Sequence, residues 1–404
     1  MRKINVRDFR RATRSTAREI NRQIVLNLVR EHQPISRADL ARRMEVGRGM
    51  VTALITDLLA EGALVEGETV DAPRGRKPKM LFVRTHDRLV VAVDIRFSRT
   101  YVMLSDFGGT QIALETFATT FEPAELVSEI AGRVERLTRA HGAVGSVEGI
   151  GLVVPGLVDR YTGRVLNAPQ LGWKDVDIRD ALSVATGLPV FIENAPMACA
   201  LAQMWMGQRG GDGGGDFVYV TVSDGVGTGI VVNGQLLRGT GNTAGEFGHI
   251  PLDPDGPECL CGRFGCWEAY TSNLATLSRY LGSTARQSRD LLQTIGITVP
   301  ELINRARTGD DKARAAILET GRYLGMGLGN VINALNPSRI IVGGEITAAW
   351  DLIEGEVREA MVSRSFSSAA ETMPIIPEQS TEYPRLRGAT ALVAVQSFAA
   401  PRVA

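Results

Sequence analysis

The first 61 residues show three consecutive segments in which apolar positions recur at helical spacing. Residues 16–32 predict one amphipathic helix that ends before Pro34. Ser36 is typical of an N-cap, so a short helix is expected over 37–44. A third helix is expected over 48–61. The pattern therefore predicts a small helical unit at the start of the chain.

The third predicted helix has two distinct faces, and Gly62 after it is typical of a helix C-cap. The face expected to be buried consists of Val51, Leu54, Ile55, Leu58 and Leu59. The opposite face consists of Arg48, Gly49, Thr52, Ala53 and Thr56. A short helix, a glycine turn and a second helix form the helix-turn-helix pattern, whose second helix enters the major groove of DNA.

Strand-like segments over 63–66 and 80–83 flank a basic turn over 74–79, which predicts the wing of a winged helix-turn-helix. Basic side chains at such a tip can lie along phosphates or in a minor groove. The candidate DNA contacts are Arg37, Arg48, Thr52 and Thr56 on the helices, and Arg74, Arg76 and Lys77 in the turn. A three-helix module for protein interactions is the alternative.

From residue 89 onward, buried strands alternate with helices. Strands are expected over 89–95, 100–105, 111–119, 149–154, 190–194, 217–223 and 340–344, and helices over 123–140, 177–186 and 300–335. Two strand-rich blocks, each completed by helices, indicate two α/β lobes with a ligand cleft between them. The expected domains are 1–83, then 84–192 completed by a C-terminal helix over about 386–404, and 193–385.

Composition agrees with a globular protein and excludes some alternatives. The chain has 404 residues, of which 44% are hydrophobic and 22% charged, so disorder is excluded as the main state. No apolar run approaches the ~18–20 residues that span a bilayer, and the N-terminus lacks an apolar signal core. We therefore expect a cytoplasmic protein.

The net charge of zero conceals a strong asymmetry along the chain. Residues 1–86 contain 18 Lys/Arg and 10 Asp/Glu, so the remaining 318 residues contain 27 and 35. A basic segment on an acidic body indicates a nucleic-acid module fused to another domain. The alternative is a solvated, arginine-rich surface without a partner.

Four residues have the types and spacing of a metal site. His249 precedes Cys259, Cys261 and Cys266 in a glycine-containing segment. Three thiolates and one imidazole match a closed tetrahedral zinc site, whose role is structural because no position stays open. Free cysteines or a redox pair are the alternatives, and Cys199 is expected in the core.

These motifs carry a resemblance to a known family. Residues 245–249 and the Cys-x-Cys-Gly-x-x-Gly-Cys-x-Glu run that ends at Glu268 resemble the signature of the ROK family. This family comprises sugar kinases and sugar-responsive repressors on an actin-like, duplicated RNase H-like fold with two lobes. Residues 1–83 resemble the winged helix that the regulators carry, and residues 152–173 are similar to the sugar-lobe segment of the family.

The resemblance implies a sugar pocket formed by Asn194, Glu246, His249 and Glu268. Carboxylates and an amide suit the hydroxyls of a sugar, which both donate and accept hydrogen bonds. By analogy, His249 would bind zinc with one nitrogen and the sugar with the other. Surface or capping roles are the alternative for these residues.

Three departures from the family kinases argue against catalysis. Ala195 stands where the kinases have the Asp that acts as general base, and a methyl group accepts no proton. Arg96 and Phe97 replace small residues of the first phosphate loop, and Asp224 would repel phosphates. We expect neither ATP binding nor phosphoryl transfer. Gln170, where the family often has Asn, adds a further change in the pocket.

The sequence thus favours a transcriptional regulator, expected to repress carbohydrate-metabolism genes as a homodimer or homotetramer on double-stranded operator DNA. A sugar effector in the cleft would control it. One alternative is a sugar kinase with a DNA-binding head. Another is a ligand-independent regulator whose cleft is vestigial.

Overall fold

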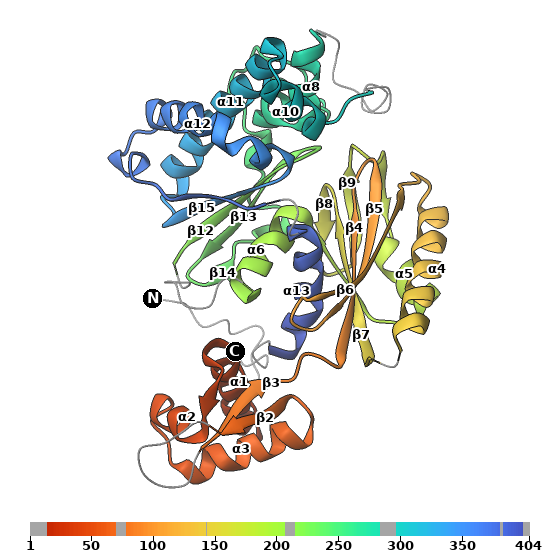
Figure 1. Ribbon diagram of the computed structural model, residues 1–404, viewed down its shortest axis with the longest axis vertical. Coiled ribbons are helices and arrows are strands. Elements are labelled where there is room, and N and C mark those ends of the chain that lie inside the picture. Colours follow the sequence, from red (N-terminus) through yellow and green to blue (C-terminus); the bar gives the residue numbers. More distant parts are fainter. Residues whose placement is uncertain are drawn as a thin grey trace.

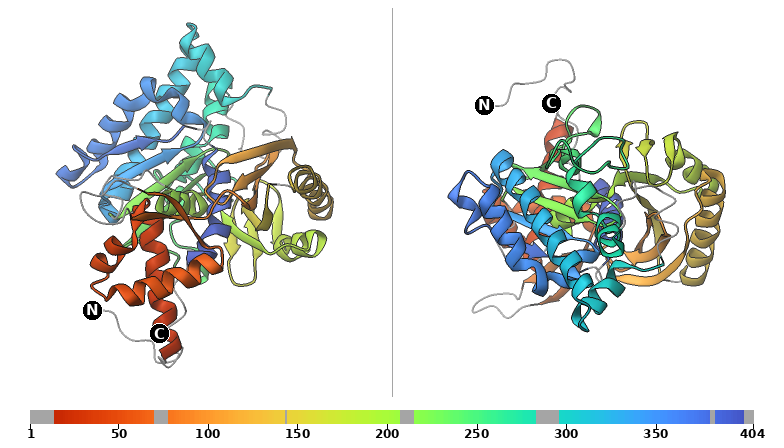
Figure 2. Two further views of the ribbon diagram at one scale, coloured as in Figure 1. Left: turned by 60° about the horizontal axis from the view of Figure 1, so that its bottom comes forward. Right: turned by 90° about the horizontal axis from the view of Figure 1, so that it is seen from above.

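The computed structural model describes residues 14–69, 78–142, 144–206, 215–282, 296–379 and 383–398. These residues form a small N-terminal head and a larger body of two lobes (Figure 1). Viewed from above, the two lobes lie side by side (Figure 2). Among the helices described, none has the length and apolar character needed to cross a membrane.

The head is a winged helix-turn-helix, as the pattern predicts. It contains α1 (Arg14–His32), α2 (Arg37–Arg43), α3 (Arg48–Ala60), β1 (Ile35–Ser36), β2 (Leu64–Thr69) and β3 (Lys79–Val83), with the strands in the order β1-β3-β2. The Ser36 hydroxyl accepts a hydrogen bond from the backbone N–H of Asp39 and so caps α2. Gly62 has a φ of +71°, a conformation that favours glycine, and the chain leaves α3 there.

The first lobe is a five-stranded sheet in the order β11-β7-β4-β5-β6. Its strands are β4 (Arg88–Ile95), β5 (Arg99–Asp106), β6 (Gln111–Ala118), β7 (Ser146–Val154) and β11 (Val190–Asn194). Helices α4 (Pro123–His141) and α5 (Ile178–Thr186) cover its outer face (Figure 1). A small sheet of β8 (Leu157–Asp159), β9 (Arg164–Ala168) and β10 (Trp173–Val176) follows β7 and leads to the cleft.

The second lobe repeats this topology. Its strands are β12 (Phe217–Val222), β13 (Val226–Val232), β14 (Gln235–Leu236), β15 (Arg339–Gly343) and β16 (Ile375–Pro377), in the order β14-β13-β12-β15-β16. In both sheets an antiparallel trio is extended by two parallel strands. The repetition confirms the duplicated α/β fold.

Helices complete the second lobe and connect the two sheets. The lobe carries α7 (Trp267–Thr271), α8 (Asn273–Leu281), α10 (Val299–Arg307), α11 (Asp311–Leu335) and α12 (Trp350–Arg364), with short 3-10 turns η1 (Thr240–Asn242), η2 (Phe247–His249), η3 (Glu345–Ala349) and η4 (Ser368–Ala370). Helices α6 (Ala195–Met206) and α13 (Pro384–Phe398) pack together between the lobes (Figure 1). Since α6 follows β11 directly, a domain boundary at 192/193 would fall inside that strand.

Candidate functional site

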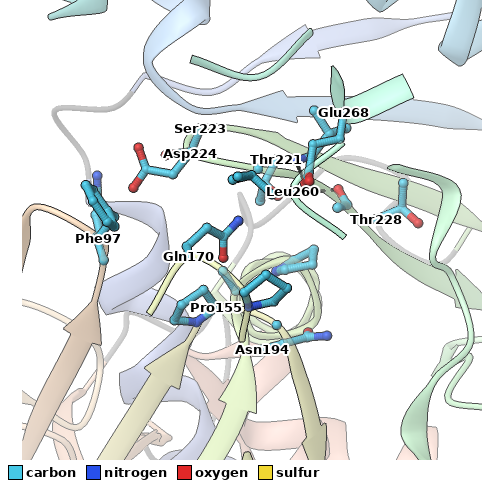
Figure 3. Close-up of a pocket in the computed structure, with 18 of the residues that line it drawn as sticks. Phe97, Pro155, Gln170, Asn194, Thr221, Ser223, Asp224, Thr228, Leu260 and Glu268 are labelled. Carbon is cyan, nitrogen blue, oxygen red and sulfur yellow. Dashed lines mark hydrogen bonds between the residues drawn. The ribbon is translucent and has the colours of Figure 1, made fainter. Parts of the chain in front are cut away.

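A pocket opens between the two lobes, with about 820 Å³ of empty space including its mouth. All four residues of the predicted sugar site line it. Asn194 comes from the end of β11, whereas Glu246, His249 and Glu268 come from the second lobe. Figure 3 shows Asn194 and Glu268 on opposite sides of this space. The fold therefore brings together side chains that are up to 74 positions apart in sequence.

His249 lies between the pocket and the cysteines. Its Nδ1 is 3.9 Å from the Cys259 Sγ, and its Nε2 is 3.9 Å from a carboxylate oxygen of Glu246. Burial raises the pKa of Glu246, and the neighbouring carboxylate of Glu268 raises it further. His249 acts in the opposite direction and lowers this pKa. One ring nitrogen thus faces the cysteines and the other faces a pocket carboxylate.

The three cysteines and His249 form a cluster with the geometry of a metal site. Their ligand atoms lie within 4.8 Å of one another, and the Sγ atoms of Cys261 and Cys266 are 3.7 Å apart. Four tetrahedral ligands at about 2.3 Å from a zinc ion lie about 3.8 Å from one another, so this donor set fits such an ion. Burial raises the pKa of the Cys266 thiol to about 11, so a cation is needed to ionise it at neutral pH.

Glu268 is held between this cluster and the second sheet. One carboxylate oxygen accepts a hydrogen bond of 2.9 Å from the backbone N–H of Val226, at the start of β13. The other accepts a bond of 3.3 Å from the Cys259 thiol. The position of this pocket carboxylate therefore depends on the cysteine segment.

Asn194 has a structural bond as well as a place in the pocket. Its side-chain oxygen accepts a hydrogen bond of 3.1 Å from the backbone N–H of Met197, in the first turn of α6. The preceding Glu193 is buried and bonds to Arg238 and Asn242 of the other lobe. Sequence reasoning missed this network, because Arg238 and Asn242 lie 45 and 49 positions after Glu193 and belong to no motif.

A second network of charges lies at the opposite end of the pocket. Arg96 pairs with the buried Asp94 at 2.7 Å and, across the lobes, with Glu345 at 3.1 Å. Arg385, at the start of α13, is 2.8 Å from the other oxygen of Asp94. Burial and Glu345 raise the pKa of Asp224, whereas the two arginines act in the opposite direction. Arg96 and Asp224 were singled out from the sequence, but Glu345 and Arg385 were not.

Comparison with known proteins places this geometry in a family. A profile described as the ROK family matches residues 90–396. The chain belongs to the ROK family. It is 30% identical over 357 residues to the xylose repressor of Caldicellulosiruptor bescii, with 86% of this chain and 89% of that protein covered.

Two solved ROK structures are similar to this chain. A ROK family transcriptional regulator, described as a homolog of the E. coli MLC protein, shares 26% identity, has a TM-score of 0.77 and covers 95% of this chain and 97% of its own. A ROK family glucokinase from Streptomyces griseus, in complex with glucose and AMPPNP, shares 28% identity with a TM-score of 0.64. It covers 98% of its own chain but only 75% of this one. The regulator thus matches this ROK chain over more of its length.

The head presents the predicted DNA-contacting face of α3 to solvent. Arg48, Thr52 and Thr56 are exposed, while the apolar side of α3 is buried apart from the half-buried Leu59. The Thr52 and Thr56 hydroxyls donate to backbone carbonyls four residues earlier in the helix. Arg37 pairs at 2.6 Å with Glu66 of β2, so it already stabilises the wing. The predicted contacts Arg74, Arg76 and Lys77 lie outside the described residues.

The head meets the body at the ends of α6 and α13. The guanidinium of Arg30, in α1, stacks on the rings of Trp205 and Phe398 and donates to the Trp205 carbonyl at 3.3 Å. Asn27 donates to the Phe398 carbonyl at 3.1 Å. Figures 1 and 2 show the head on the side of the body where α13 ends. Both interlobe helices therefore begin at the pocket and end at the head.

Proposed function

We propose that this ROK protein is a transcriptional repressor that binds operator DNA through its head and a sugar effector in its interlobe pocket. The observation that carries the proposal is the course of α6 and α13. Ala195 and Arg385, near their first residues, line the pocket, and Trp205 and Phe398, near their last, contact Arg30 of the head. A ligand that moves the lobes would thereby move the head.

The chemistry of the pocket supports a sugar as the ligand. Glu246 and Glu268 offer carboxylate oxygens, and Gln170 and Asn194 contribute amides to the same lining. Hydroxyl groups are the donors that such acceptors match, and an uncharged ligand avoids repulsion from the two carboxylates. The name of the Caldicellulosiruptor relative makes D-xylose the first effector to test here.

The metal site supports the pocket in this proposal. Cys259, Cys261, Cys266 and the Nδ1 of His249 would hold one zinc ion with no open position, which makes the ion structural. Bound there, it would supply a fixed positive charge that keeps the thiols ionised. The ion would thereby fix the His249 ring, whereas Glu268 keeps its bond from the Val226 backbone N–H.

We infer that the chain does not transfer phosphate. Ala195 lines the pocket with a methyl group and offers no general base. The side chains of Arg96, Asp94 and Glu345 form ion pairs at the end of the cleft where the kinases of this family place their first phosphate loop. Incubation with ATP and each test sugar is expected to yield no sugar phosphate, and turnover would favour a kinase with a DNA-binding head.

In this proposal, two copies of the head bind a symmetric operator together. Winged-helix dimers present two recognition helices to half-sites about one helical turn, or multiples of one turn, apart. We propose a homodimer or homotetramer whose recognition-helix spacing changes when the effector binds. Such control requires that the two arrangements differ in their affinity for the sugar.

Selection of bound genomic DNA fragments, with and without D-xylose, D-glucose and N-acetyl-D-glucosamine, tests the whole proposal. The expected result is a discrete set of palindromic sites that one sugar releases. Replacing Arg48 and Thr52 with Ala should relax the sequence preference, whereas replacing Arg76 and Lys77 should weaken all binding and lower the salt slope. Sites that no sugar releases would favour a ligand-independent regulator with a vestigial cleft.

A further inference from the structure

One carboxylate in the head lies between two cations that come from different elements. Glu66 belongs to β2, Arg37 is the first residue of α2, and Lys79 is the first residue of β3. One Glu66 oxygen is 2.6 Å from the guanidinium of Arg37, and the other is 2.6 Å from the ammonium of Lys79. The three side chains therefore form one cluster, in which each carboxylate oxygen is bound by a different cation.

The small sheet of the head brings these residues together, although they span 42 positions in sequence. The central strand is β3, which pairs with β2 on one side and with β1 on the other. In this register Glu66 lies opposite Leu81, two residues after Lys79. Arg37 follows β1 directly at the start of α2. Strand pairing thus holds the carboxylate close to both cations.

Both cations lie in parts of the motif that face the DNA backbone in a helix-turn-helix. The recognition helix, here α3, enters the major groove, while the helix before it crosses the phosphates. Arg37 begins that preceding helix and is one of the DNA contacts expected from the sequence. Lys79, the last residue of the basic turn 74–79, is not among those expected contacts. Figure 1 shows α2, β2 and β3 together in the head.

The cluster has the chemistry of an anion site that is already filled. Carboxylate and phosphate oxygens accept hydrogen bonds from the same cationic donors. The hydrogen bonds from Lys79 and Arg37 hold the pKa of Glu66 below its usual range, so this carboxylate is charged at neutral pH. The side chains of Lys79 and Glu66 keep 55% and 25% of their surface accessible. A phosphate can therefore reach the cluster, where it meets an anion in its place.

We propose that Arg37 and Lys79 form a binding site for one phosphate of duplex DNA, and that Glu66 occupies this site in the free protein. Glu66 competes with the phosphate and so lowers the affinity of the head for DNA of every sequence. Because phosphate contacts carry no sequence information, the preference for the operator over other DNA stays the same. This assignment rests on the proposed function, since it specifies how the head meets its DNA.

The variant Glu66→Gln tests the assignment, because Gln keeps the size and an acceptor oxygen but loses the charge. The full chain is titrated with a labelled duplex of scrambled sequence and with the genomic fragment that wild type selects, between about 50 and 200 mM salt. Affinity for both duplexes should rise about 3- to 10-fold. The slope of log K against log salt should steepen by about 1, as expected for one more phosphate contact.

Glu115→Gln is the matched control. Glu115 is also held by two cations, Arg133 and Arg136, but it belongs to β6 of the body. The substitution changes the net charge by the same amount, so it should leave the affinity for both duplexes and the salt slope unchanged. An equal gain in this control would show that net charge, and not the cluster in the head, controls DNA affinity.

Removal of the two cations identifies the site itself. In a chain that carries Arg37→Ala and Lys79→Ala, Glu66→Gln should change DNA affinity by no more than about twofold, because the phosphate site is gone. An undiminished gain in that background would contradict the assignment of Arg37 and Lys79.

A purely structural role of Glu66 predicts a change of opposite sign. If Glu66 only braced the wing, Glu66→Gln would bind the selected fragment more weakly and melt at a lower temperature, and this result would overturn the proposal. If Glu66→Gln binds the scrambled duplex more tightly but wild type prefers no genomic site, the proposed function fails while Glu66 keeps its role. If wild type selects an operator that sugar releases, and the variant binds it with the same affinity and salt slope, only the role of Glu66 fails.

Discussion

The guanidinium carbon of Arg30 lies 4.1 Å from the centre of the Trp205 ring. Arg30 belongs to the first helix of the head, and Trp205 to the last turn of α6. The same guanidinium lies 5.6 Å from the Phe398 ring of α13. Because both helices begin at the pocket, this junction is where a change between the lobes would reach the DNA-binding head.

The first prediction is that Arg30→Ala separates sugar binding from DNA release. The substitution removes a partly buried cation–π contact worth about 1–2 kcal/mol and a bond to the Trp205 carbonyl. The variant's affinity for sugar should stay within about twofold of wild type. Sugar should change the variant's affinity for DNA much less than it changes that of wild type. Parallel calorimetry and DNA titrations measure both. Arg18→Ala, which removes an exposed ion pair between α1 and Asp57 of α3, is the control and should respond normally.

The second prediction concerns the ion pair that joins the lobes. Arg96→Ala should lower the free energy of unfolding by about 3 kcal/mol, because it leaves the buried Asp94 with one partner and Glu345 with none of its arginine bonds. Arg136→Ala breaks an exposed pair with Glu115 and should cost no more than about 1 kcal/mol. Denaturant titrations compare the two variants. Equal losses would show that the interlobe pair adds no special stability.

The third prediction is that the zinc site supports the sugar site. Cys259→Ser should abolish bound zinc and weaken sugar binding tenfold or more, because the segment that places His249 beside the pocket loses its metal. Cys199→Ala removes a buried thiol of α6 that is not part of the cluster, so it should retain one zinc per chain. Metal analysis and calorimetry provide the measurements. Full zinc content in Cys259→Ser would contradict the assigned ligand set.

The fourth prediction is a pH-dependent gain in stability from Asp224→Asn. The pKa of Asp224 is raised by burial and by Glu345, so the folded state favours the protonated carboxyl. The stability gained from this protonated carboxyl is fully present below the pKa of Asp224 in the unfolded chain. It is lost as the pH rises through the raised pKa of the folded state. Asn keeps the neutral form, so the variant should melt at a higher temperature than wild type at pH 7.5. The difference in melting temperature should shrink toward pH 4. A difference that stays constant with pH would show that the charge on Asp224 is not its cause.

The fifth prediction concerns the recognition helix. The Thr52 and Thr56 hydroxyls use their proton within α3, so each side chain offers bases only an acceptor oxygen and a methyl group. We expect the methyl group to make the contact, with a thymine methyl as its partner. Thr52→Val, which keeps a methyl group, should bind the operator nearly as well as wild type, whereas Thr52→Ser should bind more weakly. Replacing the contacted thymine by uracil should reproduce the loss in wild type. If Ser binds better than Val, the hydroxyl and not the methyl makes the contact.

The fold could be predicted where local patterns decide the structure. Helical spacing and the Ser36 cap define the head, and apolar runs mark most of the main strands. The exception is β13 (Val226–Val232), whose glycines made its first residues resemble a turn. The small sheet of β8, β9 and β10 and the two-residue strands β1 and β14 were not foreseen. Such short strands carry no periodicity of their own, and their partners in tertiary structure determine them.

The candidate site also has a part that the sequence predicted and a part that it did not. The cysteine spacing is local, so the metal cluster could be predicted, and the family signature brought Glu246, His249 and Glu268 together with Asn194. Glu345 and Arg385 lie 249 and 289 positions after Arg96 and belong to no motif. Only the folded chain shows that these charges meet in the cleft.

The pairing of Arg96 with Glu345 has a consequence for physiology. In this protein, side chains of the two lobes neutralise each other across the cleft. Under the function proposed above, which includes no phosphate transfer, we expect the protein to respond to the concentration of its sugar and not to the ATP level of the cell. Its response to sugar should therefore be the same in growing cells and in cells whose ATP concentration has fallen. Repression would then follow the amount of sugar available and not the rate at which the cell consumes it.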